Sequence, residues 1–197
     1  MTAGAGGGAR TRARQAVRAQ VAAMAVDLFL ERGFEETTVE DICARAEISR
    51  STFFRYFPSK EDTLFERTAD TGRAWLDALV ARPAGEQPWA ALRGSLDPRI
   101  EQLAAGGENV KRLMRLIVAT PALAARHREK NAYWQELLRP EVARRLGAEP
   151  GDTADPRADA MIAAALGCLD AALKAWASSD RAAELPVLLD RAMSVVD

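Results

Sequence analysis

Apolar residues recur at intervals of three and four residues along most of the chain, and no segment shows the strict alternation of a β-strand. Glycine, proline and helix-capping residues divide this pattern into about nine predicted helices. These helices cover approximately residues 10–32, 39–46, 50–57, 59–80, 89–103, 108–119, 121–146, 156–178 and 181–196. We therefore expect an all-α fold with a flexible tail at 1–9, a three-helix domain at 10–58 and a larger helical domain at 59–197.

Two short helices joined by a tight turn are predicted in the first domain. The apolar stripe of the first helix consists of Val39, Ile42, Cys43 and Ala46. Thr38 and Asp41 occupy the positions of a capping pair at its start. Ser49 can cap the second helix, and Pro58 ends it because the residue before a proline resists the α conformation. This order of elements is typical of a helix-turn-helix.

The second short helix has an apolar side and a polar, basic side. Phe53 and Phe57 form the apolar side. The outer residues are Arg50, Ser51, Thr52, Arg55 and Tyr56. Arginine suits guanine or phosphate, and hydroxyl groups suit phosphate or base edges, so this face has the composition of a recognition helix in a DNA groove. The alternative is a solvated polar face, which explains the charges but not the order of caps, turn and basic residues.

This stretch resembles the DNA-binding domain of the tetracycline-repressor (TetR) family of transcriptional regulators. The matching segments are Glu31-Arg32-Gly33-Phe34, Thr37-Thr38-Val39 with Asp41-Ile42, Ile48-Ser49-Arg50, and Thr52-Phe53 through Tyr56-Phe57-Pro58-Ser59-Lys60, within residues 14–66. The resemblance implies double-stranded DNA as a partner. The residues expected to contact it are Thr38, Arg45, Arg50, Ser51, Thr52, Phe54, Arg55, Tyr56 and Lys60.

Two positions depart from the family pattern. Glu47 stands where the turn usually has a glycine, so a residue with a side chain must adopt or avoid a positive φ. Phe54 stands where a tyrosine is frequent, and a hydroxyl group that would contact phosphate is therefore missing. Neither departure changes the interpretation.

Composition and charge narrow the function further. Hydrophobic residues make up 48% of the 197 residues, and no apolar run approaches the ~20 residues of a membrane-spanning helix. The glycine-rich start lacks the apolar region of a signal peptide, so we expect a cytoplasmic protein without a membrane partner. The net charge of −1 argues against indiscriminate binding to nucleic acid. Arg10, Arg12, Arg14 and Arg18 form a basic arm that contacts phosphate or is simply solvated.

No arrangement of residues indicates catalysis, a metal site or a cofactor. Cys43 and Cys168 lack metal-ligand spacing, and we expect both to be buried or half-buried. His127 is the only histidine and has no nucleophile or further ligand near it in sequence, so we expect it at the surface or at the edge of a pocket. An enzyme would need a nucleophile–base pair, a metal cluster or a cofactor motif.

The middle helices carry apolar and aromatic residues that form either a core or a ligand pocket. They are Trp75, Leu79, Trp89, Leu92, Leu96, Met114, Ile117, Val118, Tyr133, Trp134 and Leu137. Two tryptophans and a tyrosine near loops and kinks slightly favour a pocket for a small hydrophobic effector. The last two predicted helices form either a homodimer interface or part of the core of one subunit.

The middle of the chain also resembles a subgroup of TetR-like regulators related to the mycofactocin-system regulator. The matching residues are Arg112-Leu113-Met114-Arg115-Leu116-Ile117, Thr120-Pro121-Ala122-Leu123, Ala125-Arg126, Glu129 and Trp134. This resemblance implies fatty acyl-CoA effectors. Arg112, Arg115 and Arg126 would then bind a phosphate of coenzyme A, or they are solvated or paired with acids.

The expected function is a homodimeric repressor that a small hydrophobic ligand releases from a palindromic operator. The continuous helix predicted at 59–80 would link the ligand site to the DNA-binding domain. A small all-helical enzyme acting on hydrophobic substrates and a ligand-independent DNA-binding protein are the alternatives.

Overall fold

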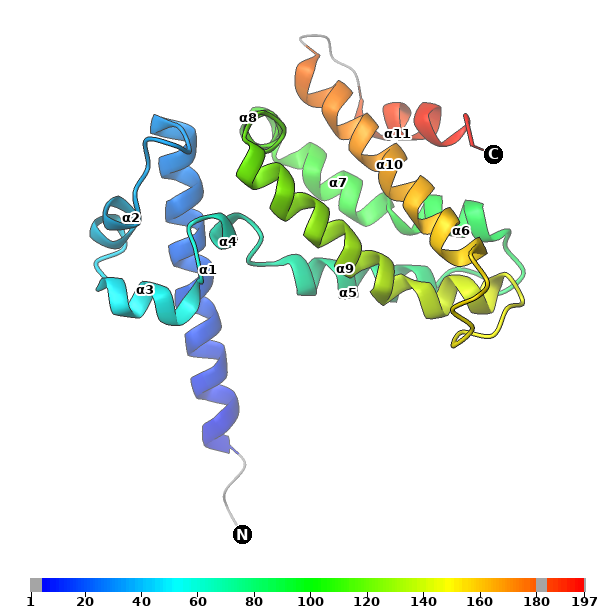
Figure 1. The fold of residues 1–197 in the computed structure, drawn as a ribbon, viewed down its shortest axis with the longest axis horizontal. Helices are drawn as coiled ribbons and strands as arrows, with labels where there is room; N and C mark the ends of the chain where they lie inside the picture. The colour runs from blue at the N-terminus through cyan, green and yellow to red at the C-terminus, as the bar shows by residue number, and fades with distance from the viewer. Residues whose placement is uncertain (1–4, 180–183, 197) are drawn as a thin grey trace. The chain divides into compact units, whose positions relative to one another are not determined.

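Helices are the only regular secondary structure in residues 5–179 and 184–196, which are the residues that this computed structural model describes. These helices are α1 (Ala5–Arg32), α2 (Val39–Arg45), α3 (Arg50–Tyr56), α4 (Glu61–Leu64), α5 (Thr68–Val80), α6 (Pro88–Ser95), α7 (Asp97–Ala105), α8 (Gly107–Ala119), α9 (Pro121–Arg145), α10 (Arg157–Ser178) and α11 (Leu185–Met193) (Figure 1). The chain divides into two compact units, Met1–Arg67 and Thr68–Asp197. The all-α expectation is confirmed.

Two of the nine predicted helices are divided, which gives eleven helices in the described residues. The expected continuous helix at 59–80 is wrong, because Phe65 leaves the helical conformation with φ −107° and ψ 18° after α4. The helix predicted at 89–103 is also divided, since α6 and α7 meet at Leu96, just before Asp97-Pro98. Proline has no N–H group and therefore cannot continue the hydrogen bonding of a preceding helix.

The boundaries at the N-terminus and between the units also differ from the expectation. Residues 5–9, expected to be part of a flexible tail, belong to α1. Extending an existing helix needs no new nucleus, and each glycine costs only about 1 kcal/mol. The units divide after Arg67 rather than after Pro58, because α4 packs against α1. Residues 1–4, and the expected start of the last helix at 181, lie outside the described residues.

The first unit, α1 to α4, surrounds an apolar core. Its largest fully buried side chains are Leu28, Phe29, Ile42, Phe53 and Phe57. Gly33 ends α1 with φ +94° and donates its N–H to the carbonyl of Phe29 at 3.0 Å, as the glycine in this position predicted. The hydroxyl group of buried Thr37 donates to the carbonyl of Gly33 at 2.7 Å. The segment that leads into α2 is therefore held against the core.

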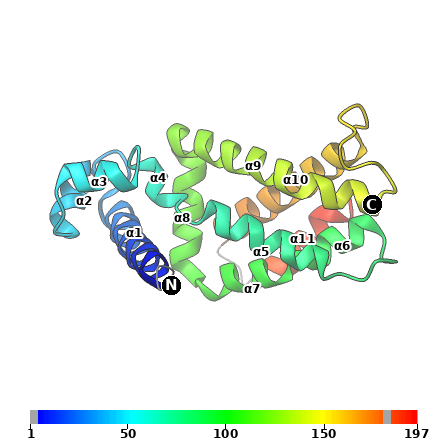
Figure 2. The ribbon, with the colours of Figure 1, turned by 90° about the horizontal axis from the view of Figure 1, so that it is seen from below.

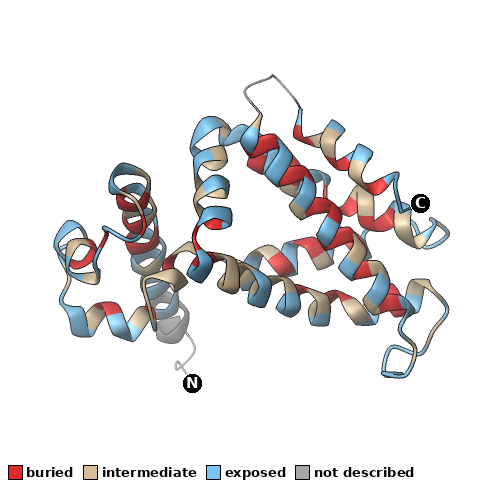
Figure 3. Ribbon diagram, turned by 45° about the horizontal axis from the view of Figure 1, so that its top comes forward, coloured by how far each residue is buried: buried red, intermediate tan, exposed pale blue. Residues whose placement is uncertain are grey.

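The second unit is organised around α10, which packs against α6, α8, α9 and α11 (Figure 2). Buried residues lie along one side of this helix, and exposed residues lie along the opposite side (Figure 3). Within the described residues, α10 alone is long and apolar enough to cross a membrane, with a mean hydropathy of 1.4 in an 18-residue window that is 50% buried in this protein. Asp170 and Lys174 interrupt the apolar sequence of this helix, so it contains no uninterrupted apolar run of that length. A core helix of a soluble protein has the same properties.

Candidate nucleic-acid interface and ligand cavity

The first helix of the helix-turn-helix begins with a reciprocal capping pair. The hydroxyl oxygen of Thr38 accepts the N–H of Asp41 at 3.1 Å. The carboxylate of Asp41 accepts the N–H and the hydroxyl group of Thr38 at 2.9 Å and 2.6 Å. These hydrogen bonds from Thr38 lower the pKa of the Asp41 carboxyl group. The predicted cap is confirmed, and the exposed Thr38 hydroxyl, expected to contact DNA, takes part in it.

The turn between α2 and α3 contains one residue with a left-handed backbone, Glu47, at φ +53°. The next N–H, that of Ile48, donates to the carbonyl of Cys43 at 3.0 Å. The hydroxyl oxygen of Ser49 then accepts the N–H of Thr52 at 3.2 Å and caps α3. A left-handed conformation costs a residue with a Cβ atom about 1–2 kcal/mol, so Glu47 places strain in this turn that a glycine would not.

The outward face of α3 is formed by four exposed residues. They are Arg50, Ser51, Phe54 and Arg55. Thr52 and Tyr56 are half-buried, and Phe53 is fully buried. The Ser51 and Thr52 hydroxyl oxygens lie 2.9 Å and 3.0 Å from the hydroxyl oxygen of Ser49, so both hydroxyl groups take part in the start of the helix. Two arginines, one serine and one phenylalanine are the residues that α3 presents to a partner.

The arginines expected at DNA are paired with acids of the same unit. Arg50 lies 2.8 Å from Glu40, and Arg45 lies 2.8 Å from Glu31. All four side chains are more than 40% exposed. Exposed ion pairs of this kind contribute only about 0–1 kcal/mol and weaken with salt. Exchange of the carboxylate for a phosphate or a base is therefore inexpensive for both arginines.

Lys60 has partners inside the unit. Its ammonium group donates to the carbonyls of Phe34 and Thr37 at 2.7 Å and 2.9 Å. It also lies 4.2 Å from the centroid of the Phe34 ring. The residue precedes α4 rather than lying in its first turn. Two of the three ammonium N–H groups are thus used to hold the segment before α2.

Two arginines of the expected basic arm also contact their own unit. Arg14 lies 5.7 Å from the centroid of the Tyr56 ring, and Arg18 lies 5.3 Å from that of Phe57. Arg12 is exposed, and the side chain of Arg10 lies outside the part of the chain described in this detail. The arm therefore supports α3 through at least two of its four arginines.

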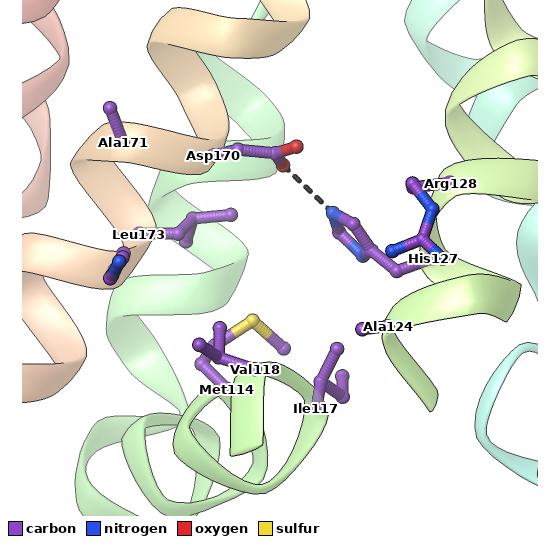
Figure 4. Close-up of a pocket in the computed structure, with 10 residues that line it drawn as sticks. Met114, Ile117, Val118, Ala124, His127, Arg128, Asp170, Ala171 and Leu173 are labelled. Carbon is purple, nitrogen blue, oxygen red and sulfur yellow. Dashed lines mark hydrogen bonds and ion pairs between the residues drawn. The ribbon is translucent and has the colours of Figure 1, made fainter. Parts of the chain in front are cut away.

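A cavity of about 300 Å³ lies in the second unit, between α8, α9 and α10 (Figure 4). Its lining residues are Met114, Ile117, Val118, Ala124, His127, Arg128, Asp170, Ala171, Leu173 and Lys174. The side chains of Met114, Ile117 and Val118 from α8 face a wall formed by the imidazole of His127 and the carboxylate of Asp170 (Figure 4). The cavity is therefore mostly apolar, with one polar side.

The polar side of the cavity is held by hydrogen bonds between α9 and α10. His127 Nε2 lies 2.8 Å from Asp170 Oδ1, and Asn131 Nδ2 donates to Asp170 Oδ2 at 2.8 Å. The ammonium group of Lys130 lies 4.1 Å from the centroid of the Trp134 ring. Burial lowers the pKa of Lys130 to about 8, although the nearby Asp170 carboxylate acts in the opposite direction.

The residues expected to bind a ligand fall into two groups. Met114, Ile117 and Val118 line the cavity. The residues that belong to the core of the unit are Trp75, Leu79, Leu92, Leu96 and Trp134, with Trp89 packed against them. Tyr133 is 41% exposed, and Leu137 is half-buried.

Trp75 and Trp134 have internal hydrogen-bond partners, which agrees with a packing role. The indole N–H of Trp75 donates to the hydroxyl of Ser95 at 2.9 Å, and that of Trp134 donates to the carbonyl of Thr68 at 2.9 Å. The alternative of plain core packing therefore describes these two residues.

The polar residues of the cavity were not among the ligand contacts expected from the sequence. One signal was available, because the Asp170 carboxylate interrupts the apolar stretch from Ala160 to Leu173 in α10. The position expected for His127, at a surface or pocket edge, corresponds to its place in the cavity wall. Its pairing with Asp170 joins residues 43 positions apart, which no local pattern indicates.

The three arginines considered for a coenzyme A phosphate do not line this cavity. Arg115 donates to the carbonyl of Ala177 at 2.5 Å and pairs with Glu108. Arg126 pairs with Glu129 at 2.5 Å, whereas Arg112 is exposed. Arg115 and Arg126 are therefore paired with acids, which was the alternative to a phosphate-binding role.

Both units of the chain match families of known proteins. Residues 22–67 match the family described as bacterial regulatory proteins, tetR family, and residues 86–197 match the MftR C-terminal domain. The chain is 33% identical over 168 residues to the HTH-type transcriptional regulator TcmR of Streptomyces glaucescens, covering 82% of this chain and 74% of TcmR. It is 29% identical over 189 residues to MftR of Mycobacterium tuberculosis, a protein named for regulation of mycofactocin biosynthesis, covering 94% and 91% of the two chains.

A solved structure is similar over most of the chain. The TetR-family repressor FadR of Thermus thermophilus, crystallised with lauroyl-CoA, has a TM-score of 0.61 and 24% identity, and the match covers 91% of this chain and 92% of FadR. This likeness concerns the fold. The sequence matches identify a regulator rather than an enzyme, which excludes the enzyme alternative. The chain belongs to the TetR family of DNA-binding transcriptional regulators and has a C-terminal domain of the MftR type.

Proposed function

We propose that this protein is a cytoplasmic homodimeric repressor that leaves a palindromic operator when a small apolar effector occupies the cavity between α8, α9 and α10. The observation that carries the proposal is the combination of an exposed arginine face on α3 with an apolar cavity in the second unit of the same chain. Release by ~100-fold requires about 2.7 kcal/mol of coupling between the two sites, which is an ordinary allosteric magnitude.

The lining of the cavity supports an apolar ligand with a polar end. Its volume of about 300 Å³ lies at the lower limit for ligand pockets. Methionine, isoleucine, valine and leucine side chains provide the apolar walls, and Arg128 and Lys174 are exposed cations at its edge. An acyl chain inside and the coenzyme A phosphates outside, near these cations, is the arrangement that we propose for an acyl-CoA. FadR, which was crystallised with lauroyl-CoA, provides the precedent for this class.

Operator binding with candidate effectors tests this proposal. The operator is first selected from random duplexes with the intact protein, and its dissociation constant is then measured by fluorescence anisotropy. Lauroyl-CoA, lauric acid and coenzyme A are the three probes. Release by lauroyl-CoA alone supports the acyl-CoA proposal, and release by lauric acid supports a simpler apolar acid. If none of the three probes changes the affinity, the acyl-CoA proposal is refuted and the ligand-independent alternative is favoured.

A matched pair of variants locates the effector. Ala124→Phe places a ring in the cavity, whereas Ala132→Phe places the same ring at an exposed position of the same helix. The first variant should bind the operator normally but no longer respond to the effector. The second should respond like the wild type. An equal response of both variants would place the effector elsewhere.

The exposed face of α10 supports the proposed dimer. The small exposed residues that share this face are Ala160, Ala163, Gly167 and Ala171. Small side chains allow two helices to approach closely, as in a four-helix bundle formed by α10 and α11 of two subunits. The inward face of α10 belongs to the core of one subunit, so this helix would serve both roles that the sequence analysis considered.

Gly167→Trp tests this interface without disturbing the subunit. A Cβ atom at Gly167 would have no atom within 4 Å, and the same is true of the loop residue Gly85. We expect Gly167→Trp to be monomeric in sedimentation velocity and to bind the palindromic operator weakly. Gly85→Trp should remain dimeric. A dimeric Gly167→Trp variant with normal affinity would show that the subunits associate through another surface.

A further inference from the structure

An aromatic ring without any polar atom lies on the outward face of the recognition helix. Phe54 is 48% exposed, whereas Phe29, Phe34 and Phe57 of the same unit are buried. The neighbouring Phe53 of the same helix is fully buried. The fold therefore places one ring of this pair inside the unit and leaves the other available to a partner.

The position of the exposed ring is restrained by its neighbours. The Phe54 ring meets Phe53 edge to face, with centroids 5.4 Å apart and an interplanar angle of 88°. The guanidinium group of Arg50, one helical turn earlier, lies 6.0 Å from the Phe54 centroid and is paired with Glu40 at 2.8 Å. The ring is thus supported from the buried side by Phe53 and flanked on the outward face by a cation.

The chemistry of the DNA major groove restricts what this ring can recognise. Phenylalanine has no donor or acceptor, so it can form a hydrogen bond neither to a phosphate nor to a base edge. The 5-methyl group of thymine is the apolar feature of the major groove, and it distinguishes thymine from the other bases. A restrained, exposed ring is suited to pack against this methyl group.

We propose that Phe54 is a specificity-determining residue that contacts the 5-methyl group of a thymine in each operator half-site. Residues four positions apart are separated by about 6 Å along a helix, and base pairs are stacked about 3.4 Å apart. The thymine read by Phe54 therefore lies within one or two base pairs of the position contacted by Arg50. The inference depends on α3 lying in the major groove, as in the proposed function.

Replacement of thymine by deoxyuridine tests this contact, because it removes only the methyl group and leaves base pairing unchanged. Each thymine of the selected operator is replaced symmetrically in both half-sites, and the affinity is measured by fluorescence anisotropy. For the wild type we expect one position at which the replacement weakens binding by about fourfold per half-site, the factor for one methyl group at ~0.8 kcal/mol. For Phe54→Ala, thymine and deoxyuridine at that position should bind equally.

Two further variants separate this role from a general loss of affinity. Phe54→Leu keeps an apolar side chain and should retain a preference for thymine. Arg55→Ala removes an exposed cation from the same helix and should weaken binding to both operators by the same factor. Because the Phe54 side chain is exposed, the thermal unfolding of Phe54→Ala should remain close to that of the wild type.

The outcomes distinguish this inference from the proposed function. Tight operator binding with no thymine-sensitive position, or with unchanged sensitivity in Phe54→Ala, overturns the role of Phe54 alone. Failure to select any operator overturns both the inference and the proposed function. A thymine preference that is lost in Phe54→Ala and retained in Phe54→Leu supports the inference.

Discussion

Replacement of Lys130 by methionine should stabilise the second unit at neutral pH. Lys130 is half-buried, and its ammonium group lies 4.1 Å from the centroid of the Trp134 ring. A lysine whose pKa falls from 10.5 to about 8 on folding costs about 3 kcal/mol at pH 7, since each pKa unit corresponds to ~1.36 kcal/mol. Methionine has a similar length and no charge, but it loses the attraction between the cation and the ring, worth ~0.5–2 kcal/mol. We expect a net gain of about 1–3 kcal/mol.

The gain should depend on pH in a defined direction. Below pH 8 the lysine is charged in both the folded and the unfolded protein, so the full cost of burial is present. Between about pH 8 and 10.5 the folded protein releases the proton while the unfolded chain keeps it, and the stability of the wild type rises. The advantage of Lys130→Met should therefore shrink over this interval and be absent above it.

Urea unfolding followed by tryptophan fluorescence measures this effect. All four tryptophans, Trp75, Trp89, Trp134 and Trp176, lie in the second unit, so their emission reports this unit by itself. The titration of other groups contributes equally to the free energy of unfolding of the variant and of the wild type, so it cancels in the difference between them. Lys174→Met, at an exposed position of α10, is the control and should change the stability by no more than ~0.5 kcal/mol. A less stable Lys130→Met, or an advantage that is the same at pH 7 and pH 10.5, would refute the reasoning.

Three further substitutions have expected outcomes. Glu47→Gly should be more stable than Glu47→Ala by about 0.5–1 kcal/mol, as measured by hydrogen exchange of α2 and α3. At φ +53° a residue with a side chain is strained by ~1–2 kcal/mol, and glycine avoids this strain but loses more backbone entropy on folding. The opposite order of stability would argue against strain in the turn. Gly72→Ala should lower the thermal stability by about 1–3 kcal/mol, because the new Cβ would lie 2.6 Å from an atom of Trp134. Gly85→Ala, whose new Cβ would have no atom within 4 Å, should change the thermal stability by no more than ~0.5 kcal/mol. Equal effects of the two substitutions would contradict the close approach at Gly72. Lys60→Met should destabilise the first unit by about 1.5–3 kcal/mol, because two hydrogen bonds to carbonyls are lost, and far-UV circular dichroism measures this loss. The salt dependence of DNA binding should remain unchanged. A reduction of the salt slope by about 1 with unchanged stability would indicate a phosphate contact instead.

The sequence was sufficient for the local structure of the helix-turn-helix. The cap formed by Thr38 and Asp41 and the end of α1 at Gly33 occur where their residues predicted them. The reason is that a cap depends on groups within three or four residues of one another, so neighbouring residues determine it. The departure at Glu47 was also visible in the sequence, although its positive φ was known only from the structure.

The same local information could not separate core from cavity in the second unit. Trp134 and Met114 both satisfy a helical apolar pattern, but Trp134 lies in the core and Met114 lines the cavity. Periodicity shows which side of a helix is apolar, and it does not show whether the neighbouring helix fills the space opposite. The continuous helix expected at 59–80 failed for a related reason, since nothing in its periodicity marks the turn after Leu64.

The sequence by itself determined the helical class, the helix-turn-helix and the family of this protein, because these depend on residue spacing within a few turns of helix. Only the tertiary structure decided that Asp170 meets His127 and that Lys60 binds carbonyls 23 and 26 residues away. These contacts depend on the distances between packed helices. Such distances result from the fit of many side chains at once, and no short stretch of sequence contains them.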